Sequence, residues 1–233
     1  MADLSISMLE RSVEAITEED SSLADSLTSD LERIERMDDE IEDAALQILC
    51  RFQPTASDAR TVAAVLKSIT HLERIAKYAA NIAVATKYLE DKPSYPPLTL
   101  IKPVAEKALG LVRLVVNGFR NSSIDGFDTI TERDDSLDAS MKNDIQAIVA
   151  FINENEGSAD VCIYYISVLK FLERVGDHAC KMAEKVSYTC FRHLSEKVDS
   201  ISYSTVPGMG IHVSTPITRV NPRSYLHRDP IFP

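Results

Sequence analysis

Hydrophobic residues recur at helical spacing along most of the chain. A short first helix is predicted by apolar residues at steps of three to five positions: Leu4, Met8, Val13 and Ile16. The polar stretch TEEDS (17–21) then predicts a turn, with Asp20 or Ser21 as the N-cap of the next helix. That second helix is longer, and its apolar stripe repeats at three-, four- and seven-residue steps: Leu23, Leu27, Leu31, Ile34, Ile41, Ala45 and Ile48.

A third helix follows a break at Pro54, which cannot continue a helix interior. Its apolar stripe runs to Ala83, and the helix ends before the proline-rich stretch EDKPSYPP (90–97), which predicts a linker. Beyond this linker the scheme repeats. Three more helices are predicted over residues 98–121, 127–154 and 159–196.

The repeated scheme is an internal duplication. HLERIAKYAANIA (71–83) recurs as FLERVGDHACKMA (171–183), at the corresponding place in the third helix of each half. We therefore predict an all-α fold of two tandem three-helix bundles that pack side by side. The predicted boundaries are 1–92 for the first repeat, 98–196 for the second repeat and 198–233 for an irregular, non-helical C-terminal tail.

The tail differs in composition from the helices before it. Residues 198–233 hold five of the ten prolines of the chain and show no helical period. Two interpretations stay open from the sequence. The tail is either a disordered terminus or an extended segment whose apolar residues dock on a bundle or on a neighbouring subunit.

Composition narrows the classes of function. A formal net charge of −11 disfavours nucleic-acid binding, because an acidic chain gains nothing from releasing the counterions of a phosphate backbone. No apolar run approaches the roughly 18 residues of a membrane-spanning helix, so we expect a cytoplasmic protein that is peripheral to a membrane at most. The cysteines form no C-x-x-C pair, and we expect buried, reduced thiols: Cys50, Cys162, Cys180 and Cys190.

Acidic pairs at i,i+4 spacing mark the second repeat. Asp134 and Asp138 lie on the fifth predicted helix, and Glu173 and Asp177 lie on the sixth. Residues four apart share one helical face, so the two pairs can meet if the helices run antiparallel. Four carboxylates near one point either raise their pKa values or take up a cation, and oxygen ligands suit Mg²⁺, Mn²⁺, Ca²⁺ or Fe. A solvated acidic face is the alternative interpretation.

The first repeat carries a weaker version of the same pattern. Asp38 and Glu42 form a pair on the second helix, but Glu73 on the third helix is followed four residues later by Lys77. Because Lys77 can neutralise one carboxylate internally, we expect a weaker cation site there or none.

Other candidates for chemistry are poorer. His178 follows Asp177 directly and is either an outer partner of the carboxylates or a packing residue. The chain contains no P-loop, no G-x-G-x-x-G, no H-E-x-x-H and no G-x-S-x-G motif, and no Glu-x-x-His pair for di-iron chemistry. We therefore predict that the protein is not an enzyme.

Several ordered motifs resemble the PhoU family of phosphate-uptake regulators over roughly residues 8–190. The first repeat is similar in MDDEIEDAALQILCRFQPTASDARTVAAVLKSITHLERIAKYAANIA (37–83), and the second in ERDDSLDASM (132–141) and FLERVGDHACKMAE (171–184). The resemblance implies two packed three-helix bundles, commonly in a homodimer. It also implies a negative regulator that acts beside a phosphate-specific ABC transporter, at its ATPase or at a phosphate-sensing histidine kinase.

The same resemblance implies metal clusters held by the acidic i,i+4 motifs, with iron or zinc in some relatives; Mn and Mg also suit the ligands. Carried onto this chain, the implied ligands are Asp134, Asp138, Glu173 and Asp177 in the second repeat and Asp38, Glu42 and Glu73 in the first. Three features depart from the family pattern. Lys77 replaces an aspartate, Lys181 stands where an asparagine like Asn81 is usual, and the opening helix is short. A short opening helix should leave part of the first bundle uncovered, and one hypothesis is that the tail covers it.

Three functions compete at this point. The first is a binding and signalling protein that reports phosphate status by contact with a transporter or kinase. The second is a metal-dependent enzyme that handles phosphate. The third is a structural helical bundle that binds no metal. The lack of any nucleophile or nucleotide motif favours the first.

Overall fold

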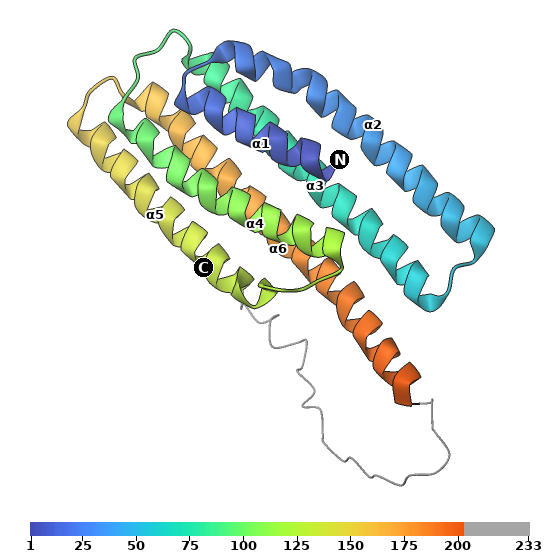
Figure 1. The fold of residues 1–233 in the computed structure, drawn as a ribbon. Helices are drawn as coiled ribbons and strands as arrows, with labels where there is room; N and C mark the ends of the chain where they lie inside the picture. The colour runs from blue at the N-terminus through green and yellow to red at the C-terminus, as the bar shows by residue number, and fades with distance from the viewer. Residues whose placement is uncertain (203–233) are drawn as a thin grey trace, which may run out of the picture. The chain divides into compact units, whose positions relative to one another are not determined.

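A computed structural model describes the backbone of residues 1–202 and the side chains of residues 1–187. Nearly all of the predicted tail, 203–233, lies outside the described residues. The elements in chain order are α1 (Ala2–Thr17), α2 (Ser21–Phe52), α3 (Ala56–Leu89), η1 (Pro96–Leu100), α4 (Ile101–Asn121), η2 (Phe127–Thr129), α5 (Ile130–Glu154) and α6 (Ala159–Ser202). The all-α architecture of two three-helix repeats is confirmed (Figure 1).

The helix ends differ from prediction in two ways. The fourth and fifth helices each enter through a 3₁₀ segment, η1 after Tyr95 and η2 after Gly126, whose φ of 80° is left-handed. The sixth helix continues to Ser202, beyond the predicted end at 196, so residues 198–202 are helical rather than irregular. The N-cap of α2 is Asp20, whose Oδ1 accepts hydrogen bonds from the backbone N–H groups of Ser22 (2.9 Å) and Leu23 (3.1 Å).

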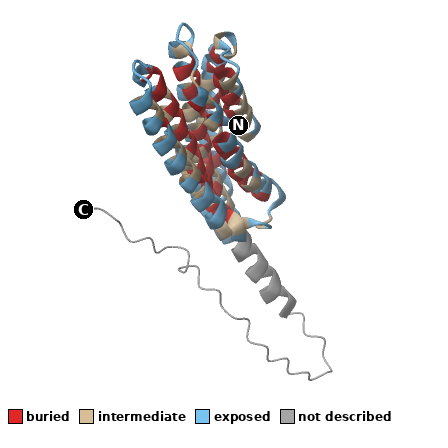
Figure 2. Ribbon diagram, turned by 90° about the vertical axis from the view of Figure 1, so that its left-hand side faces the viewer, coloured by how far each residue is buried: buried red, intermediate tan, exposed pale blue. Residues whose placement is uncertain are grey.

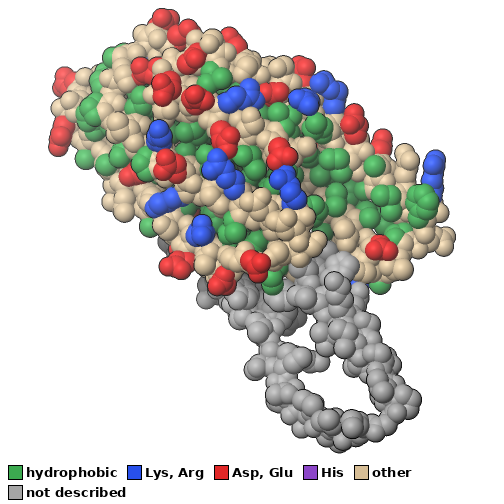
Figure 3. All heavy atoms as spheres, viewed as in Figure 1, with side chains coloured by type: hydrophobic (Ala, Val, Ile, Leu, Met, Phe, Trp, Pro, Cys, Tyr) green, Lys and Arg blue, Asp and Glu red, His purple; other side chains and the backbone are tan. Residues whose placement is uncertain are grey.

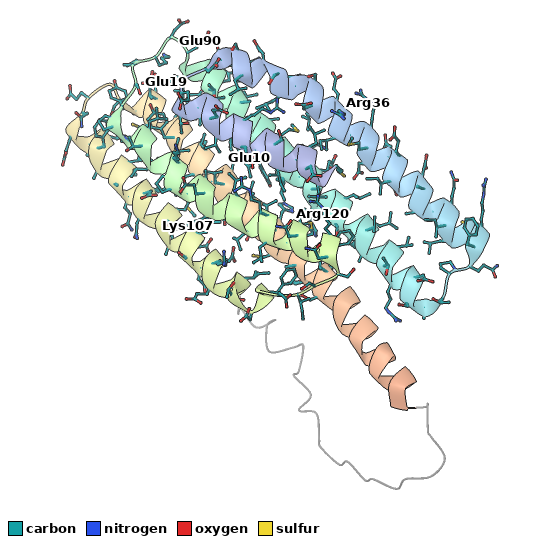
Figure 4. The ribbon with its side chains drawn as sticks, in the orientation of Figure 1. Glu10, Glu19, Arg36, Glu90, Lys107 and Arg120 are labelled. Atoms are coloured by element: carbon teal, nitrogen blue, oxygen red, sulfur yellow. The ribbon has the colours of Figure 1, made fainter. Side chains whose placement is uncertain are left out.

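One hydrophobic core runs through both repeats of the unit Met1–Lys197. Figure 2 shows the buried residues along the faces where helices meet. Helix α1 packs against α2 and α3 of its own repeat and also against α4 of the other repeat. Ion pairs support this last contact: Arg113 pairs with Glu10, and Arg120 Nη2 lies 2.7 Å from Asp3 Oδ1 (Figure 4).

Helices α3 and α6 pack side by side in opposite directions. His71 lies beside His178, and Tyr78 stacks on Phe171 with ring centroids 6.0 Å apart. Residue numbers therefore rise along α3 as they fall along α6. Burial is the same at every position in residues 71–80 as in residues 171–180. Equivalent residues of the two repeats are thus buried to the same degree. A pseudo-two-fold axis between α3 and α6 relates the two copies.

Within the part of the chain that the structure describes, the first bundle is partly uncovered, as the short opening helix predicted. Helix α1 has 16 residues, whereas α2 has 32 and α3 has 34. Beyond the reach of α1, α2 exposes Leu46, Ile48 and Phe52, and the Phe52 side chain is 74% exposed. On the face seen in Figure 3, acidic and basic side chains are interspersed with apolar ones.

The cysteines are only partly as predicted. Cys162 is buried and Cys180 is half-buried, and both are free thiols. Cys50 is also free but exposed, which corrects the prediction that it is buried, because it lies on the part of α2 that α1 does not cover. The side chain of Cys190 lies outside the described residues. Within 1–202, no helix is both long enough and apolar enough to cross a membrane.

Candidate functional site

The carboxylates of the second repeat converge between α5 and α6. Burial raises the pKa of Glu173, and the negative charge of Asp177 on the same helix raises it further. Asp138 and Asp134 act in the same direction from α5, whereas the guanidinium of Arg174 acts against them. The three predicted aspartates therefore lie close enough to Glu173 for their charges to act on it.

A glycine lets the two helices approach at this point. Gly176 lies on the buried face of α6 between Glu173 and Asp177, and a Cβ there would collide with Leu137 of α5. The same Cβ would lie 3.5 Å from Asp134 Oδ1. Because Gly176 has no side chain, α5 and its acidic pair can pack closely against α6. A glycine inside a strongly helical pattern was the sequence signal for this close packing.

Cys180 extends the contact one helical turn further. Its pKa is raised by burial and then by the charge of Asp134, with which the thiol also hydrogen-bonds. The thiol is therefore held protonated, and a protonated thiol is a poor metal ligand. The donors that the site offers are carboxylate oxygens.

The first repeat has a smaller acidic group. Burial raises the pKa of Asp38, and the charges of Glu73 and Glu42 raise it further, while Lys77 lowers it. Asp38 Oδ1 is buried and has no hydrogen-bond partner among the described residues. A buried carboxylate oxygen without a donor is costly, so it is a position where a proton or a cation would be stabilised.

Lys77 behaves as the sequence suggested. Its Nζ donates to Glu73 Oε1 at 2.5 Å and also lies 3.7 Å from Glu35 Oε1, a partner the sequence did not indicate. The ammonium group therefore occupies the place next to Glu73 that a cation would take. In the second repeat Asp177 stands at the equivalent position, and Arg174 Nε lies 3.6 Å from Glu173 Oε2.

The ring of His178 contacts α3. It points into the packing between α3 and α6, where its Nδ1 lies 3.1 Å from Nδ1 of His71 and its ring lies beside Tyr78. Burial, followed by the neighbouring His71 and Lys181, lowers the pKa of His178 to about 4. Both rings are neutral at pH 7, so one Nδ1–H can donate to the other. No local pattern predicts this pair, because its members come from different repeats.

The acidic residues have the donor chemistry for a metal ion but not the arrangement. In the part of the chain with described side chains, no group of three or more His, Cys, Asp or Glu side chains is arranged to hold a metal ion. The chemistry of the donors nonetheless fits an oxygen-coordinated cation, since neighbouring carboxylates raise the pKa of Glu173 in the second repeat and of Asp38 in the first, and Asp38 Oδ1 lacks a donor among the described residues. A coordination sphere would require these side chains to rotate toward one another, and the ligand assignments remain predictions.

Comparison with known proteins identifies the family. The PhoU domain model matches residues 1–86 and again 101–186, one match for each three-helix repeat. The chain belongs to the PhoU family. The resemblance read from the acidic and Leu-Glu-Arg motifs is thereby confirmed.

Relatives cover most of the chain. It is 30% identical over 190 residues to the phosphate-specific transport system accessory protein PhoU homolog of Pseudomonas putida, covering 79% of this chain and 74% of that one. The Thermotoga maritima homolog 1 is also 30% identical, over 181 residues, covering 77% of this chain and 78% of that one.

Solved structures share the fold. The crystal structure of PhoU from Pseudomonas aeruginosa aligns with a TM-score of 0.79 at 26% identity, covering 82% of this chain and 92% of that chain. The phosphate transport system regulatory protein PhoU from Streptococcus pneumoniae aligns with a TM-score of 0.74 at 19% identity, covering 81% of this chain and 88% of that chain, which supports the fold alone. Two PhoU repeats are therefore both the sequence family and the fold of this protein.

Proposed function

We propose that this PhoU protein regulates phosphate uptake by contact with a phosphate-specific ABC transporter, at its ATPase subunit or at a phosphate-sensing kinase. The observation that carries the proposal is the match of both repeats to the PhoU domain, with relatives named as accessory proteins of phosphate-specific transport. The acidic net charge and the lack of nucleotide or nucleophile motifs favour regulation by protein contact. We propose a homodimer as the working assembly.

We further propose that the second-repeat carboxylates hold a metal cation. The residues that would hold it are Asp134, Asp138, Glu173 and Asp177, and a bound ion would neutralise their mutual repulsion and so stabilise the folded bundle. In the first repeat Lys77 supplies part of this neutralisation at Glu73. The second repeat is therefore the more strongly cation-dependent of the two.

The function is tested in a bacterial host whose own PhoU protein has been deleted. Expression of this chain should restore repression of phosphate uptake, and the transporter ATPase or the kinase should co-purify with it from phosphate-replete cells. Glu173→Ala and Asp177→Ala should weaken both effects, whereas Glu154→Ala, which removes an exposed acidic residue at the end of α5, should not. Unchanged uptake together with no co-purifying transporter or kinase component would contradict the proposal.

A regulator that holds no metal is the second candidate. It is favoured by the lack, within the described side chains, of any group arranged to coordinate an ion. Element analysis of purified protein, together with thermal unfolding in EDTA and in Mn²⁺, decides between them. Retained metal and a higher melting temperature with Mn²⁺ support the cation site, while neither supports the metal-free bundle.

A further inference from the structure

The outer faces of α3 and α6 form one continuous surface. The pseudo-two-fold axis between the two helices reverses their direction but keeps their exposed faces on the same side of the molecule. On each helix the exposed positions recur at steps of three, four or seven residues, so they line one face. The exposed residues of this surface, here called the α3–α6 face, include Arg74, Val84 and Tyr88 of α3 and Ile163, Lys170, Arg174 and Lys181 of α6.

The middle of the α3–α6 face is basic. The aromatic pairs between the two helices set a register in which Arg74 and Arg174 lie at nearly the same level. Lys170 lies about one turn from Arg174 on α6, and Lys181 about two turns from it in the other direction. After burial and the other histidine of the pair, the charges of Lys181 and Arg74 lower the pKa of His178. Both cations therefore lie near the centre of the contact between the helices.

The charges of these side chains are available to a partner. Arg74, Lys170 and Lys181 form no ion pair with any described residue. Arg174 has one, a contact of 3.6 Å between its Nε and Glu173 Oε2. The whole chain has a net charge of −11, so this basic strip is a local exception. Such a strip attracts and orients a negatively charged partner.

The end of the face where α3 ends is apolar and aromatic. Val84, Tyr88 and Ile163 are 51%, 61% and 58% exposed. Tyr88 stacks on Tyr164 of α6, with ring centroids 5.4 Å apart, which holds its exposed ring in place. Exposed aliphatic side chains next to tyrosines are typical of surfaces that bind proteins.

The duplication indicates that the fold does not require these residues. In the register of the repeated motif, the equivalent positions of the other repeat are also exposed but carry different residues: Ala63 for Ile163, Thr70 for Lys170, Asn81 for Lys181 and Glu184 for Val84. The same environment thus accepts a small or polar residue, so packing does not explain the isoleucine, the valine and the lysines. The two halves of the face have become different, which gives the face a direction.

We propose that the α3–α6 face binds an acidic, amphipathic helix of a partner protein. The apolar residues of that helix pack on Tyr88 and Ile163, and its carboxylates lie over the basic middle, where Arg74 can bind a carboxylate through two parallel hydrogen bonds. From Arg74 to Tyr88 the face is roughly 20 Å long at 1.5 Å per residue, so a partner helix of about 15 residues spans it. The inference rests on the proposed function, regulation by protein contact, and names the surface and the chemistry of that contact.

Two other occupants fit the face less well. A second copy of this chain in a two-fold contact would bring the basic middle of one copy against that of the other. A flat anionic membrane would also approach the acidic groups on both sides of the face. These are Glu73 and Glu35 toward α2, and Glu173 with its neighbouring aspartates toward α5. A single helix is narrow enough to contact the basic strip alone.

The test is fluorescence anisotropy of the purified full chain with a labelled synthetic helix of about 15 residues, leucine-rich at one end and glutamate-rich at the other. We expect binding that weakens as salt is added, and no binding of the same peptide with lysine in place of glutamate. Equal binding of the two peptides would overturn the proposal. Binding to vesicles of phosphatidylserine and phosphatidylcholine, with no binding of the acidic peptide, would assign the face to a membrane instead and would also overturn it.

Exchanging residues between the repeats locates the binding. Ile163→Ala, Lys170→Thr and Lys181→Asn introduce the residue of the equivalent position, and each should weaken binding of the acidic peptide about tenfold. The matched controls Val149→Ala and Lys142→Thr, at exposed positions of α5, should leave it unchanged. Melting temperatures check that each variant is folded. Binding by the three variants equal to that of the parent would overturn the proposal. A changed oligomeric state in analytical ultracentrifugation, with peptide affinity unchanged, would show that a second copy uses the face.

The assay in the host without its own PhoU protein separates this inference from the proposed function. If the parent chain represses phosphate uptake but Ile163→Ala and Lys170→Thr do not, and the transporter or kinase component no longer co-purifies with them, the face is the contact surface. If both variants act like the parent, the proposed function stands and the face is not where the partner binds. If the parent itself restores no repression, the proposed function fails, and the peptide titration alone decides whether the face binds an acidic helix.

Discussion

At the scale of single residues, an important difference between the repeats lies four positions after the glutamate of each Leu-Glu-Arg motif, Glu73 or Glu173. Lys77 pairs with Glu73 and Glu35 in the first repeat, whereas Asp177 adds a further negative charge beside Glu173 in the second. One repeat therefore carries its own counterion, and the other accumulates negative charge around Glu173 that Arg174 opposes.

Replacing this lysine should make the repeats alike. Without metal, Lys77→Asp should lower the free energy of unfolding by up to about 1 kcal/mol, because a half-buried ion pair with Glu73 and a more exposed one with Glu35 are lost and a like charge is added. With Mn²⁺ present, the variant should recover more stability than the parent protein does. Thermal unfolding with and without Mn²⁺ measures both effects. Lys77→Ala is the matched control, since it removes the ammonium group without adding a ligand, and an equal Mn²⁺ response from both variants would contradict the cation interpretation.

The raised pKa of Glu173 predicts how stability depends on pH. A carboxyl whose folded-state pKa lies above its unfolded value binds more protons when folded. Its favourable contribution is present below the ordinary pKa of 4.5 and is lost as pH rises through the higher folded-state pKa. In EDTA at neutral pH, the Glu173→Gln variant should therefore be more stable than the parent by about a few tenths of a kcal/mol. This gain in stability should shrink as the pH falls toward 4.5, the ordinary pKa of the carboxyl group. Urea unfolding across this range decides, and a glutamine variant that is less stable at neutral pH would refute the argument.

At the scale of elements, the approach of α5 to α6 depends on one missing side chain. Leu137 occupies the space in front of Gly176, and this contact sets the distance between the acidic pairs of the two helices. The equivalent residue on α3 is Ala76, which is also buried, so the first repeat accepts a methyl group where the second does not.

Gly176→Ala should consequently destabilise the protein by about 1–3 kcal/mol, the usual cost of overpacking, despite the better helix propensity of alanine. Gly110→Ala on α4 is the matched control. An added Cβ there has nothing within 4 Å, so it should stabilise by about 0.5–1 kcal/mol. Denaturant unfolding compares the two, and similar stabilisation by both substitutions would show that α5 and α6 do not touch in this way.

At the scale of the whole molecule, the two repeats share one core rather than two. Helix α1 contacts α4 of the other repeat, the contact between α3 and α6 is filled by His71, His178, Tyr78 and Phe171, and the buried cluster runs through both bundles. Unfolding one repeat alone would expose this shared surface on the other, which makes partial unfolding unfavourable.

We therefore expect a single cooperative transition for the full chain. Differential scanning calorimetry should give a calorimetric enthalpy equal to the van't Hoff enthalpy. Two resolved transitions, or a calorimetric enthalpy well above the van't Hoff value, would show that the repeats unfold independently.

Features that depend on residues close together in the chain could be predicted from the sequence, and features that depend on distant residues could not. The order of the helices and the Asp20 cap depend on residues within one or two turns, and the structure has both as predicted. The prediction for His178 did not anticipate its real partner, because that partner comes from a helix of the other repeat. The burial of Cys50 was also mispredicted, since it depends on how far α1 reaches along α2.

Periodicity and ordered motifs were sufficient to predict the helices, the duplication and membership of the PhoU family, because they are local properties that can be read without knowledge of the packing. The packing of the folded chain was needed to show that α3 and α6 run antiparallel, that Leu137 packs against Gly176, and that His71 lies beside His178. These are contacts between helices distant in the chain, and they depend on side-chain shape and helix rotation, which no local pattern encodes.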